Sequence, residues 1–491
     1  MSKSLHLKKL ILSSVVALLP IASQALPIDW HGSFGVDSTL LSNYRRIESK
    51  TDNSGDGTTE ASKGTQEVAQ AGSKSSASWQ SYVFKLSPTM VINDAATFFG
   101  ELTTGYAYGG FLGDSPQTEL GNNNGNAQLY LHNQAAGQSV NIKKAYLEIY
   151  SDTATYLIGR HTYEWALGGL YNHGDETWDR HASSRDGITM KLKIGNFHVS
   201  PFWSKVSNPG YTDNGNSKEM GVGLLYDNQE RDIAFGLLYS KKSSEAGDAF
   251  YKSPVVANTP IGETNVKVTD LYFKKVFGKF DLAAEVPLVS GDLGKITSAT
   301  TLSTFSAKAI LLQTNYKHSE SWTLGFDGGQ VSGDNGSTGT FGALFLNPNF
   351  QVANILFRYN LTAFGGNTSA ASVYDSYMTN ARYFKLRSVY NSEKWTFETS
   401  LINAVAVEVA KTGATAYNHT KNKIFTAVAS QSDSLGTEFD FNAKYQWNKE
   451  ISIATGLGYL FTGDYFAYTN STSPNTAKNS LLLQISTSVT F

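Results

Sequence analysis

The C-terminal segment alternates between apolar and polar positions with a period of two. One face carries Phe491, Val489, Thr487, Ile485, Leu483 and Leu481, whereas the other carries Thr490, Ser488, Ser486, Gln484 and Leu482. A strand with an apolar outer face, a mostly polar inner face and a terminal aromatic residue is typical of a closed barrel surrounded by lipid. The pattern therefore indicates a membrane-embedded β-strand.

Paired alternating segments joined by short polar turns recur along the chain, and each pair predicts a β-hairpin. The eight pairs are 83–92 with 97–108, 141–150 with 155–161, 188–194 with 197–205, 220–226 with 233–239, 266–277 with 280–289, 307–316 with 322–331, 383–390 with 395–407, and 437–447 with 451–461. Longer segments rich in Gly, Ser, Asn, Thr and Asp separate the hairpins. This alternation of short and long connections predicts short periplasmic turns and long extracellular loops.

The hairpins also give a strand count. Together with an N-terminal strand over 30–44 and the C-terminal strand, they predict an all-β fold, a transmembrane antiparallel β-barrel of about 18 strands. Sixteen strands is the alternative if one pair is counted wrongly. The apolar segment 349–364 would break the even number if it were a strand, so we expect it to be a folded loop, and entry into the lumen is one option for it. We expect one barrel domain over 26–491, with a low-complexity surface loop at 47–78.

The N-terminal region, residues 1–25, has the parts of a secretory signal peptide. Basic residues at positions 3, 8 and 9 precede an apolar run over 10–22, and Ser23-Gln24-Ala25 forms a small-x-small cleavage site. The apolar run is too short to span a membrane and ends abruptly, so we expect cleavage after Ala25. An uncleaved membrane anchor is the alternative interpretation.

Composition narrows the class of protein. The chain has no Cys. The segment after residue 25 carries 37 basic and 42 acidic side chains, so it lacks the excess of positive charge that would predict a nucleic-acid partner. Mean hydropathy is −0.26, and no apolar run of about 18 residues follows the leader, which excludes a helical membrane protein. The 12% aromatic content fits aromatic girdles, although a soluble all-β protein could share it.

Charged residues inside the strands are predicted to point into a water-filled lumen, because lipid-facing positions must be apolar. The segment 437–447 shows the pattern most clearly, with acidic, basic and amide side chains at every second position. The predicted pore-lining residues are Lys144, Glu148, Arg160, Arg185, Lys191, Lys193, Lys385, Arg387, Glu438, Asp440 and Lys444. Both signs occur, so ion selectivity is not predicted. The alternative is that these groups only pair with one another and hold the wall together.

Several short segments resemble the alginate-export family of outer-membrane proteins. They are Ile158-Gly159-Arg160, Asn347–Val352, Leu435–Asp440 and Gly456–Phe466. The resemblance implies an 18-stranded barrel and either a general porin or a polysaccharide exporter. An exporter of a polyanion should have an arginine-rich lumen, and the mixed charge predicted here argues against it. The terminal Phe491 resembles the signal read by the outer-membrane barrel-assembly machinery.

The segment 161–185 concentrates the groups that could carry chemistry. It holds Glu164, Trp165, His173, Asp175, Glu176, Trp178, Asp179 and His181. Three interpretations stay open: a loop that folds inward and narrows the pore, an exposed loop with incidental charges, or a divalent-metal site, for which the standard ligand spacing is missing. No nucleophile elbow, phosphate loop or Cys-based site occurs in the chain. We therefore expect no catalytic residue, metal or cofactor.

The sequence thus predicts a protein of the outer membrane of a Gram-negative bacterium. The first hypothesis is a porin-like channel for passive diffusion of small hydrophilic solutes. The second is an exporter or selective channel for an anionic polysaccharide, and the third is a structural or adhesive surface barrel. The expected partners are outer-membrane lipid, the barrel-assembly machinery and small solutes or an oligosaccharide. The sequence leaves open whether the barrel forms a homo-oligomer.

Overall fold

The computed structural model describes the parts of the chain that build the barrel. These are residues 27–48, 75–104, 140–207, 217–244, 263–295, 303–337, 339–361, 372–420, 423–470 and 475–491. The predicted signal peptide and most of the predicted surface loop at 47–78 lie outside these ranges. Within them, no helix is long and apolar enough to cross a membrane.

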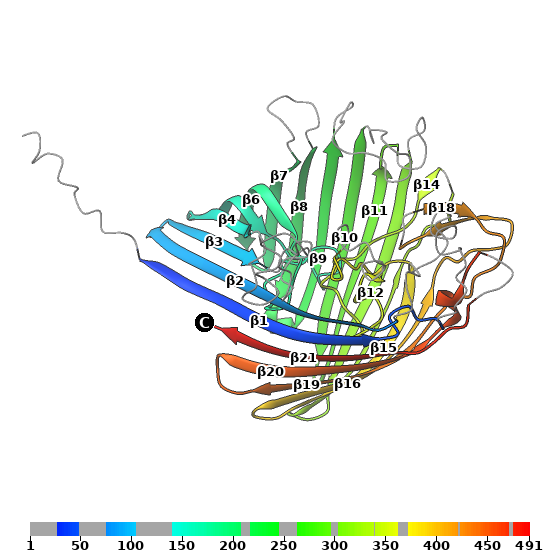
Figure 1. Cartoon of the computed structure of the whole chain (residues 1–491). Helices are drawn as coiled ribbons and strands as arrows, with labels where there is room; N and C mark the ends of the chain where they lie inside the picture. The colour runs from blue at the N-terminus through cyan, green and yellow to red at the C-terminus, as the bar shows by residue number, and fades with distance from the viewer. Residues whose placement is uncertain are drawn as a thin grey trace, which may run out of the picture.

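The wall consists of long strands, most of them joined in hairpins (Figure 1). Its strands are β1 (Ile28–Ser42), β2 (Ala77–Asn93), β3 (Ala96–Thr104), β4 (Asn141–Tyr150), β5 (Thr155–Thr162), β6 (Ser184–Ile194), β7 (Phe197–Ser207), β8 (Ser217–Asn228), β9 (Ile233–Ser244), β10 (Thr264–Phe277), β11 (Phe280–Asp292), β12 (Thr304–Lys317), β13 (Trp322–Val331), β15 (Ala381–Asn391), β16 (Trp395–Ala406), β19 (Ser434–Gln446), β20 (Ile451–Thr462) and β21 (Ser480–Thr490). The connections add β14 (Thr340–Phe341), β17 (Thr415–Asn418), β18 (Lys423–Thr426) and two short 3₁₀ turns, η1 (Gln229–Arg231) and η3 (Asp464–Ala467).

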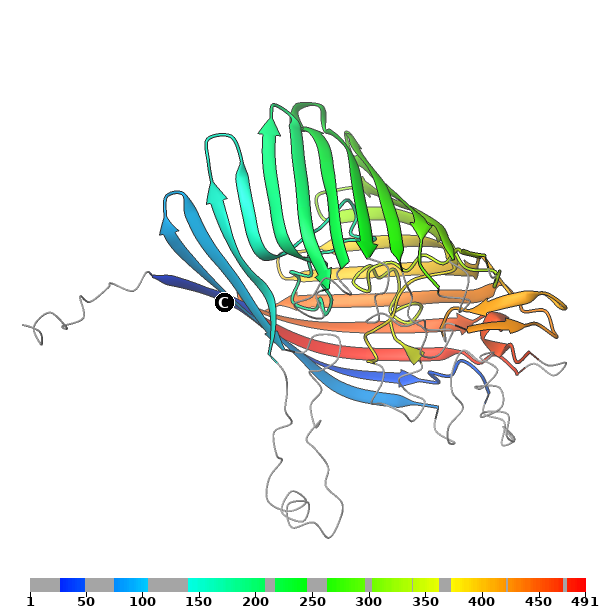
Figure 2. The same ribbon diagram turned by 90° about the horizontal axis from the view of Figure 1, so that it is seen from above.

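Each wall strand pairs antiparallel with its neighbours, and β1 pairs with β21, which closes the sheet into an 18-stranded barrel. Figure 2 shows the curved wall from above, with non-strand segments lying inside it. The prediction of an 18-stranded antiparallel barrel is confirmed. Some strands are longer than predicted. β2 begins at Ala77, before the predicted start at residue 83, and β9 continues to Ser244, beyond the predicted end at residue 239. The described part of 349–364 contains no strand, in agreement with its prediction as a folded loop.

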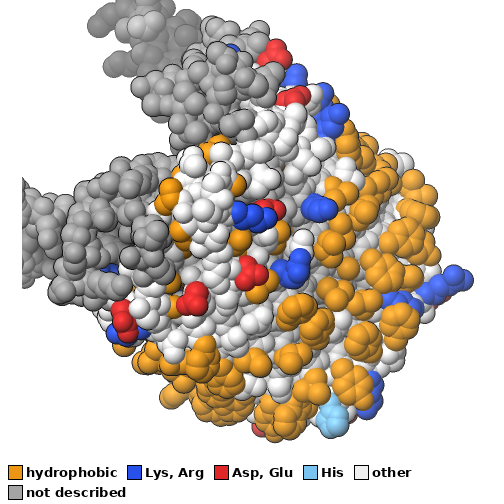
Figure 3. All heavy atoms as spheres, turned by 90° about the vertical axis from the view of Figure 1, so that its right-hand side faces the viewer, with side chains coloured by type: hydrophobic (Ala, Val, Ile, Leu, Met, Phe, Trp, Pro, Cys, Tyr) orange, Lys and Arg blue, Asp and Glu red, His pale blue; other side chains and the backbone are white. Residues whose placement is uncertain are grey.

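The outer face of the wall is apolar. Large apolar side chains on strand after strand are exposed there, for example Phe384 and Leu386 on β15 and Phe439 on β19. Aromatic residues cluster beside the short turns, where Trp395 lies 4.7 Å from Tyr445 between ring centroids. Figure 3 shows broad areas of apolar side chains on the flanks of one face. A closed barrel satisfies all backbone groups of its wall without water, so this molecule is built for lipid, and the predicted outer-membrane location is confirmed.

The inner face differs between the two ends of the barrel. We call the end with the short turns periplasmic and the other end extracellular. On the extracellular half of β10 to β21, inward side chains such as Leu311, Ile402 and Leu460 are fully buried against Leu346 and Ile355 of the β13–β15 connection. This part of the lumen is therefore a hydrophobic core, which corrects the expectation of a lumen lined throughout by polar groups.

The barrel closes at its periplasmic end through the last residue. The backbone N–H of Gly32 donates to the carbonyl of Phe491 at 2.8 Å, and the N–H of Phe491 donates back to Gly32 at 3.0 Å. A Cβ atom on Gly32 would lie 2.6 Å from the Lys85 carbonyl oxygen and 2.6 Å from the Phe491 ring. The seam therefore needs a glycine at this position.

We expect Gly32→Ala to destabilise the folded barrel, because the added methyl group must displace the β2 backbone or the Phe491 ring. Overpacking of this kind costs about 1–3 kcal/mol. The measurement is the temperature at which the refolded protein loses its compact band on an SDS gel. Gly339→Ala is the control, since nothing lies within 4 Å of a Cβ atom built there. Equal transition temperatures for the two variants would contradict the prediction.

Candidate functional site

The β5–β6 loop, residues 163–183, crosses the lumen. Near its start, the ring of Trp165 packs on β9 at Gly236, where a Cβ atom would lie 2.9 Å from it. Near its end, Trp178 packs on β1 at Gly35, at 2.7 Å from the position of a Cβ atom. Two glycines of the wall thus receive the two largest side chains of the loop. The inward-folding interpretation of this segment is the one that agrees with the structure.

Glu285 of β11 holds the middle of the β5–β6 loop. Its carboxyl oxygens accept backbone N–H bonds from Leu167 at 2.8 Å, Gly169 at 3.2 Å and Leu170 at 3.4 Å. Gly168 has φ +77°, a left-handed conformation that glycine adopts without strain and that turns these N–H groups toward one side. The carboxyl group replaces the hydrogen bonds that a loop inside a barrel cannot obtain from a β-ladder.

Lysines of β4 hold the far end of the same loop. A register shift in the pairing of β3 with β4 leaves Lys143 without a partner residue, so Lys143 and Lys144 both reach the lumen. Their Nζ atoms lie 2.9 and 2.7 Å from Asp175 Oδ1, and Lys143 also contacts Glu101 at 2.8 Å. Burial alone would raise the pKa of Asp175, but the two lysines outweigh burial and lower it to about 2.

The β13–β15 loop covers residues 332–380, of which 332–337, 339–361 and 372–380 are described. Two further wall carboxyl groups hold it. Glu438 accepts the backbone N–H of Ile355 at 2.6 Å and of Leu356 at 2.8 Å. Asp440, two residues along β19, accepts the N–H of Asn354 at 3.0 Å. Both wall side chains are almost completely buried. They face the lumen as predicted, but they bind a loop and are not in contact with a water-filled channel.

The two loops are bonded to each other. The amide of Asn349 donates to the Asn172 side chain at 2.9 Å and to the His181 carbonyl at 2.8 Å. The backbone N–H of Asn347 donates to the Gly169 carbonyl at 2.8 Å. The loops therefore form one constriction, anchored to β11 and β19 by carboxyl groups and to β4 by lysines.

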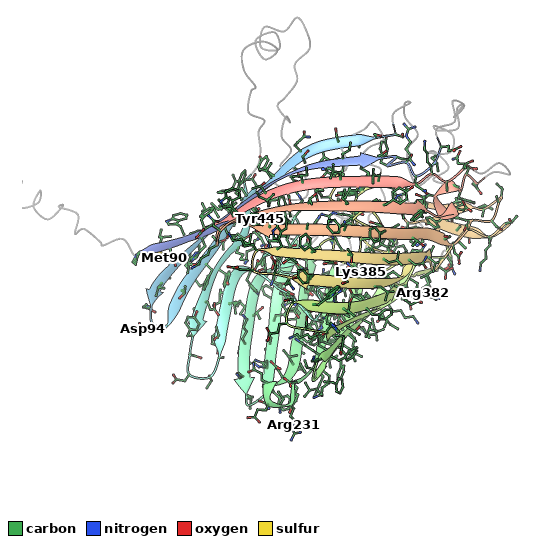
Figure 4. All side chains as sticks on the ribbon, turned by 90° about the horizontal axis from the view of Figure 1, so that it is seen from below. Met90, Asp94, Arg231, Arg382, Lys385 and Tyr445 are labelled. Atoms are coloured by element: carbon green, nitrogen blue, oxygen red, sulfur yellow. The ribbon has the colours of Figure 1, made fainter. Side chains whose placement is uncertain are left out.

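Toward the periplasmic end, the wall charges form pairs. Lys385 lies 3.2 Å from Glu398, and Arg387 lies 2.9 Å from Asp327. Figure 4 shows Lys385 and Arg382 along β15. Because they are three residues apart they point to opposite faces, and Arg382 donates to Gln330 at 2.8 Å. The alternative interpretation, in which charged groups pair and hold the wall, describes these residues well.

Other predicted pore-lining residues have different surroundings. Arg185 is buried under the β5–β6 loop, between the rings of Tyr163 at 3.7 Å and Phe202 at 3.3 Å. On the lumen side, Lys191 and Lys193 are exposed on the same face of β6 as Arg185.

Three further predicted residues complete the set. Glu148 lies two residues beyond Tyr146 on the lumen face of β4, and Lys444 borders a cavity near the periplasmic end. Arg160 requires a correction, because it shares the outer face of β5 with the exposed Ile158 and pairs with Asp186 at 2.6 Å. The alternation of strand faces decides its position, and sequence reasoning assumed that every strand charge points inward.

Sequence reasoning missed several residues that anchor the loops. Glu285 and Lys143 are buried and were not among the predicted residues, and neither was Glu101, which contacts both lysines of β4. A charged residue in the middle of an apolar strand, on its inner face, is the signal that could have identified Glu285. The bulge that turns Lys143 inward leaves no such signal in the sequence.

Two cavities flank the constriction. The periplasmic cavity, of about 350 Å³, is bordered by Asp37, Arg180, Arg358, Lys444 and Ser488 among others. The extracellular cavity, of about 260 Å³, is bordered by Arg46, Phe345, Tyr377, His419 and Phe466 among others. Within the described residues, no group of three or more His, Cys, Asp or Glu side chains could hold a metal ion.

The strand pairing and the apolar outer face decide the class. The chain is a transmembrane β-barrel of the outer-membrane type. No protein-family model matches it, and no curated protein matches it. The resemblance to the alginate-export family is therefore not confirmed.

Solved barrels align along nearly the whole chain. OccK9 (OpdG) of Pseudomonas aeruginosa has a TM-score of 0.48 and 13% identity, covering 94% of this chain and 99% of its own. OccK5 (OpdH) of the same organism has a TM-score of 0.47 and 12% identity, with 94% and 98% covered. OmpT of Vibrio cholerae has a TM-score of 0.37 and 9% identity, with 96% and 99% covered. The architecture described above rests on the strand pairing of this chain itself.

Glu438→Leu should release the β13–β15 loop, because it leaves the N–H groups of Ile355 and Leu356 without acceptors. Each buried donor left unsatisfied costs about 1–3 kcal/mol. We expect a lower unfolding temperature and larger fluctuations of single-channel current. Phe439→Leu, on the opposite face of the same strand, is the control and should resemble the wild type. Unchanged fluctuations in a folded Glu438→Leu barrel would contradict the anchoring role.

Acid should loosen the β5–β6 loop only below about pH 4. The pKa of Asp175 is lowered from 3.8 to about 2. At a pH above 3.8 its ionic contacts therefore stabilise the loop fully, and this stabilisation is lost as the pH falls toward 2. Current fluctuations recorded between pH 6 and pH 2 would show a rise in this window. Asp175→Asn should fluctuate at pH 6 already and lack the step. If current fluctuations in Asp175→Asn still rose between pH 4 and pH 2, the transition would belong to another titrating group.

Proposed function

We propose that this barrel is a passive channel for small hydrophilic solutes, narrowed by its two inward loops. The observation that carries the proposal is the pair of cavities on either side of the constriction inside one closed wall. Polar groups border both cavities, and a wet, polar lumen lowers the barrier for hydrated solutes. The loops set the size limit, since wall carboxyl groups and lysines hold them across the lumen.

The charge pairs also bear on ion selectivity. Because Lys385 and Arg387 each have an acidic partner on the wall, their fields are partly cancelled. Asp175 in turn neutralises much of the charge of the β4 lysines. This arrangement favours a channel with weak ion preference over an exporter of a polyanion, which would need uncompensated basic groups along its path.

The test is single-channel conductance of the refolded chain, residues 26–491, in a planar bilayer, with the reversal potential measured across a salt gradient. We expect stable open steps with weak ion preference. The double variant Glu398→Gln, Asp327→Asn should shift the reversal potential toward anion preference, because it leaves Lys385 and Arg387 without acidic partners.

Two outcomes would contradict the proposal. No conductance from a demonstrably folded barrel would rule out an open channel and favour a structural surface role. Strong anion preference in the wild type, with block by a uronate oligomer, would favour polysaccharide export. Recognition of Phe491 by the assembly machinery stays a prediction.

A further inference from the structure

A row of aromatic rings follows the β13–β15 loop into the lumen. Its first two members, Phe305 of β12 and Phe341 of β14, have ring centroids 5.8 Å apart. Phe341 stacks on Phe345 at 6.5 Å, and Phe345 meets Tyr377 edge-on at 6.2 Å. Tyr377 in turn lies 6.5 Å from the imidazole of His181 in the β5–β6 loop. We call these five residues the aromatic row.

The backbone explains why these rings stay partly open. β14 pairs in parallel with β12 so that Phe341 lies beside Phe305. Further along the loop, Leu344 and Leu346 are buried in the core, whereas Phe345 between them is only half-buried. Tyr377 is 43% exposed beside the completely buried Met378. The loop thus packs Leu344, Leu346 and Met378 into the core and leaves Phe345 and Tyr377 partly exposed.

The aromatic row connects the two cavities. Phe345 and Tyr377 border the extracellular cavity, and His181 borders the periplasmic cavity. The contact between Tyr377 and His181 lies where the two loops meet, at the constriction. A solute that moves from one cavity to the other along this side would therefore pass the rings of Phe345, Tyr377 and His181.

Hydrogen-bonding groups border the extracellular cavity together with the rings. They include Asn360, Asp375, Ser376 and Thr420. A flat apolar surface beside amide, carboxyl and hydroxyl groups matches a pyranose ring, whose C–H face is apolar and whose edge carries hydroxyl groups. Aromatic acids share the flat face, but their carboxylate needs a cation, and the carboxyl group of Asp375 would repel it.

Arg46, the arginine that borders the extracellular cavity, is engaged elsewhere. The guanidinium group of Arg46 lies 4.3 Å from the Phe466 ring centroid and donates to the Ile355 carbonyl at 3.1 Å. Burial lowers the pKa of His181, so its imidazole is neutral near pH 7. At the extracellular cavity, the surroundings of the row therefore favour a neutral ligand over an anionic one.

We propose that the aromatic row is a binding track for neutral, pyranose-containing saccharides, which it carries from the extracellular to the periplasmic cavity. This inference rests on the proposed channel function and narrows it to a solute class. Stacking holds the sugar face at each ring, and the flanking polar groups exchange hydrogen bonds with its hydroxyl groups. Because several similar contacts follow one another, no single site traps the solute.

The first measurement is equilibrium binding of maltotriose to the refolded barrel in detergent, by titration calorimetry. Phe345→Leu and Tyr377→Leu keep apolar volume but remove the flat ring, so each should weaken binding about three- to tenfold. Tyr377→Phe keeps the ring and should bind nearly as the wild type does. Phe384→Leu, on the lipid face of β15, is the matched control. The compact band on an SDS gel confirms that each variant is folded.

The second measurement is block of single-channel current by the same probe. Maltotriose should interrupt the current of the wild type and of Phe384→Leu. The interruptions should be less frequent in Phe345→Leu and Tyr377→Leu. Sorbitol, which has hydroxyl groups but no ring, should not interrupt it.

Three outcomes separate this inference from the channel function. Conductance without maltotriose binding would overturn the track and leave the channel. Maltotriose binding that depends on Phe345 and Tyr377 in a barrel without conductance would support the site and contradict the channel. Tighter binding of benzoate than of maltotriose, lost in the same two variants, would overturn the saccharide class.

Discussion

The need to satisfy every backbone hydrogen bond away from water shapes this molecule. In the wall this need is met by closure, because the pairing of β1 with β21 leaves no free sheet edge facing lipid. Inside the lumen the same need applies to two loops that cross it without a ladder of their own. There, Glu285, Glu438 and Asp440 act as acceptors for loop N–H groups.

This arrangement divides the lumen into two zones. In the extracellular half, the β13–β15 loop packs its aliphatic residues on inward side chains of β10 to β21, and burial of apolar surface stabilises it there. In the periplasmic half, the inner face carries paired charges and hydroxyl groups. The constriction lies where the two loops bond to each other, so its width depends on the anchors in the wall and not on the barrel alone.

The constriction combines two kinds of surface. On the β2–β4 side, lysines and acidic groups from the wall and the β5–β6 loop neutralise one another. On the side of the β13–β15 loop, aromatic rings remain partly exposed between the two cavities. A passage between these surfaces offers stacking and hydrogen bonding, with little net charge to attract or repel an ion. Such a passage suits a neutral polar solute better than a polyanion.

The sequence by itself determined the wall. A strand pattern of period two, short polar turns and an even strand number depend on local alternation and on lipid outside, so the 18 wall strands could be counted from residues alone. The face of Glu438 could be predicted in the same way, because the face of a strand residue follows from its register. The groups that Glu438 binds could not be predicted, since its partners Ile355 and Leu356 are far away in the chain. Only the tertiary structure decided which wall residues the inward loops pack on, that a bulge turns Lys143 inward and that Arg160 points outward, because these depend on contacts and strand registers between segments distant in sequence.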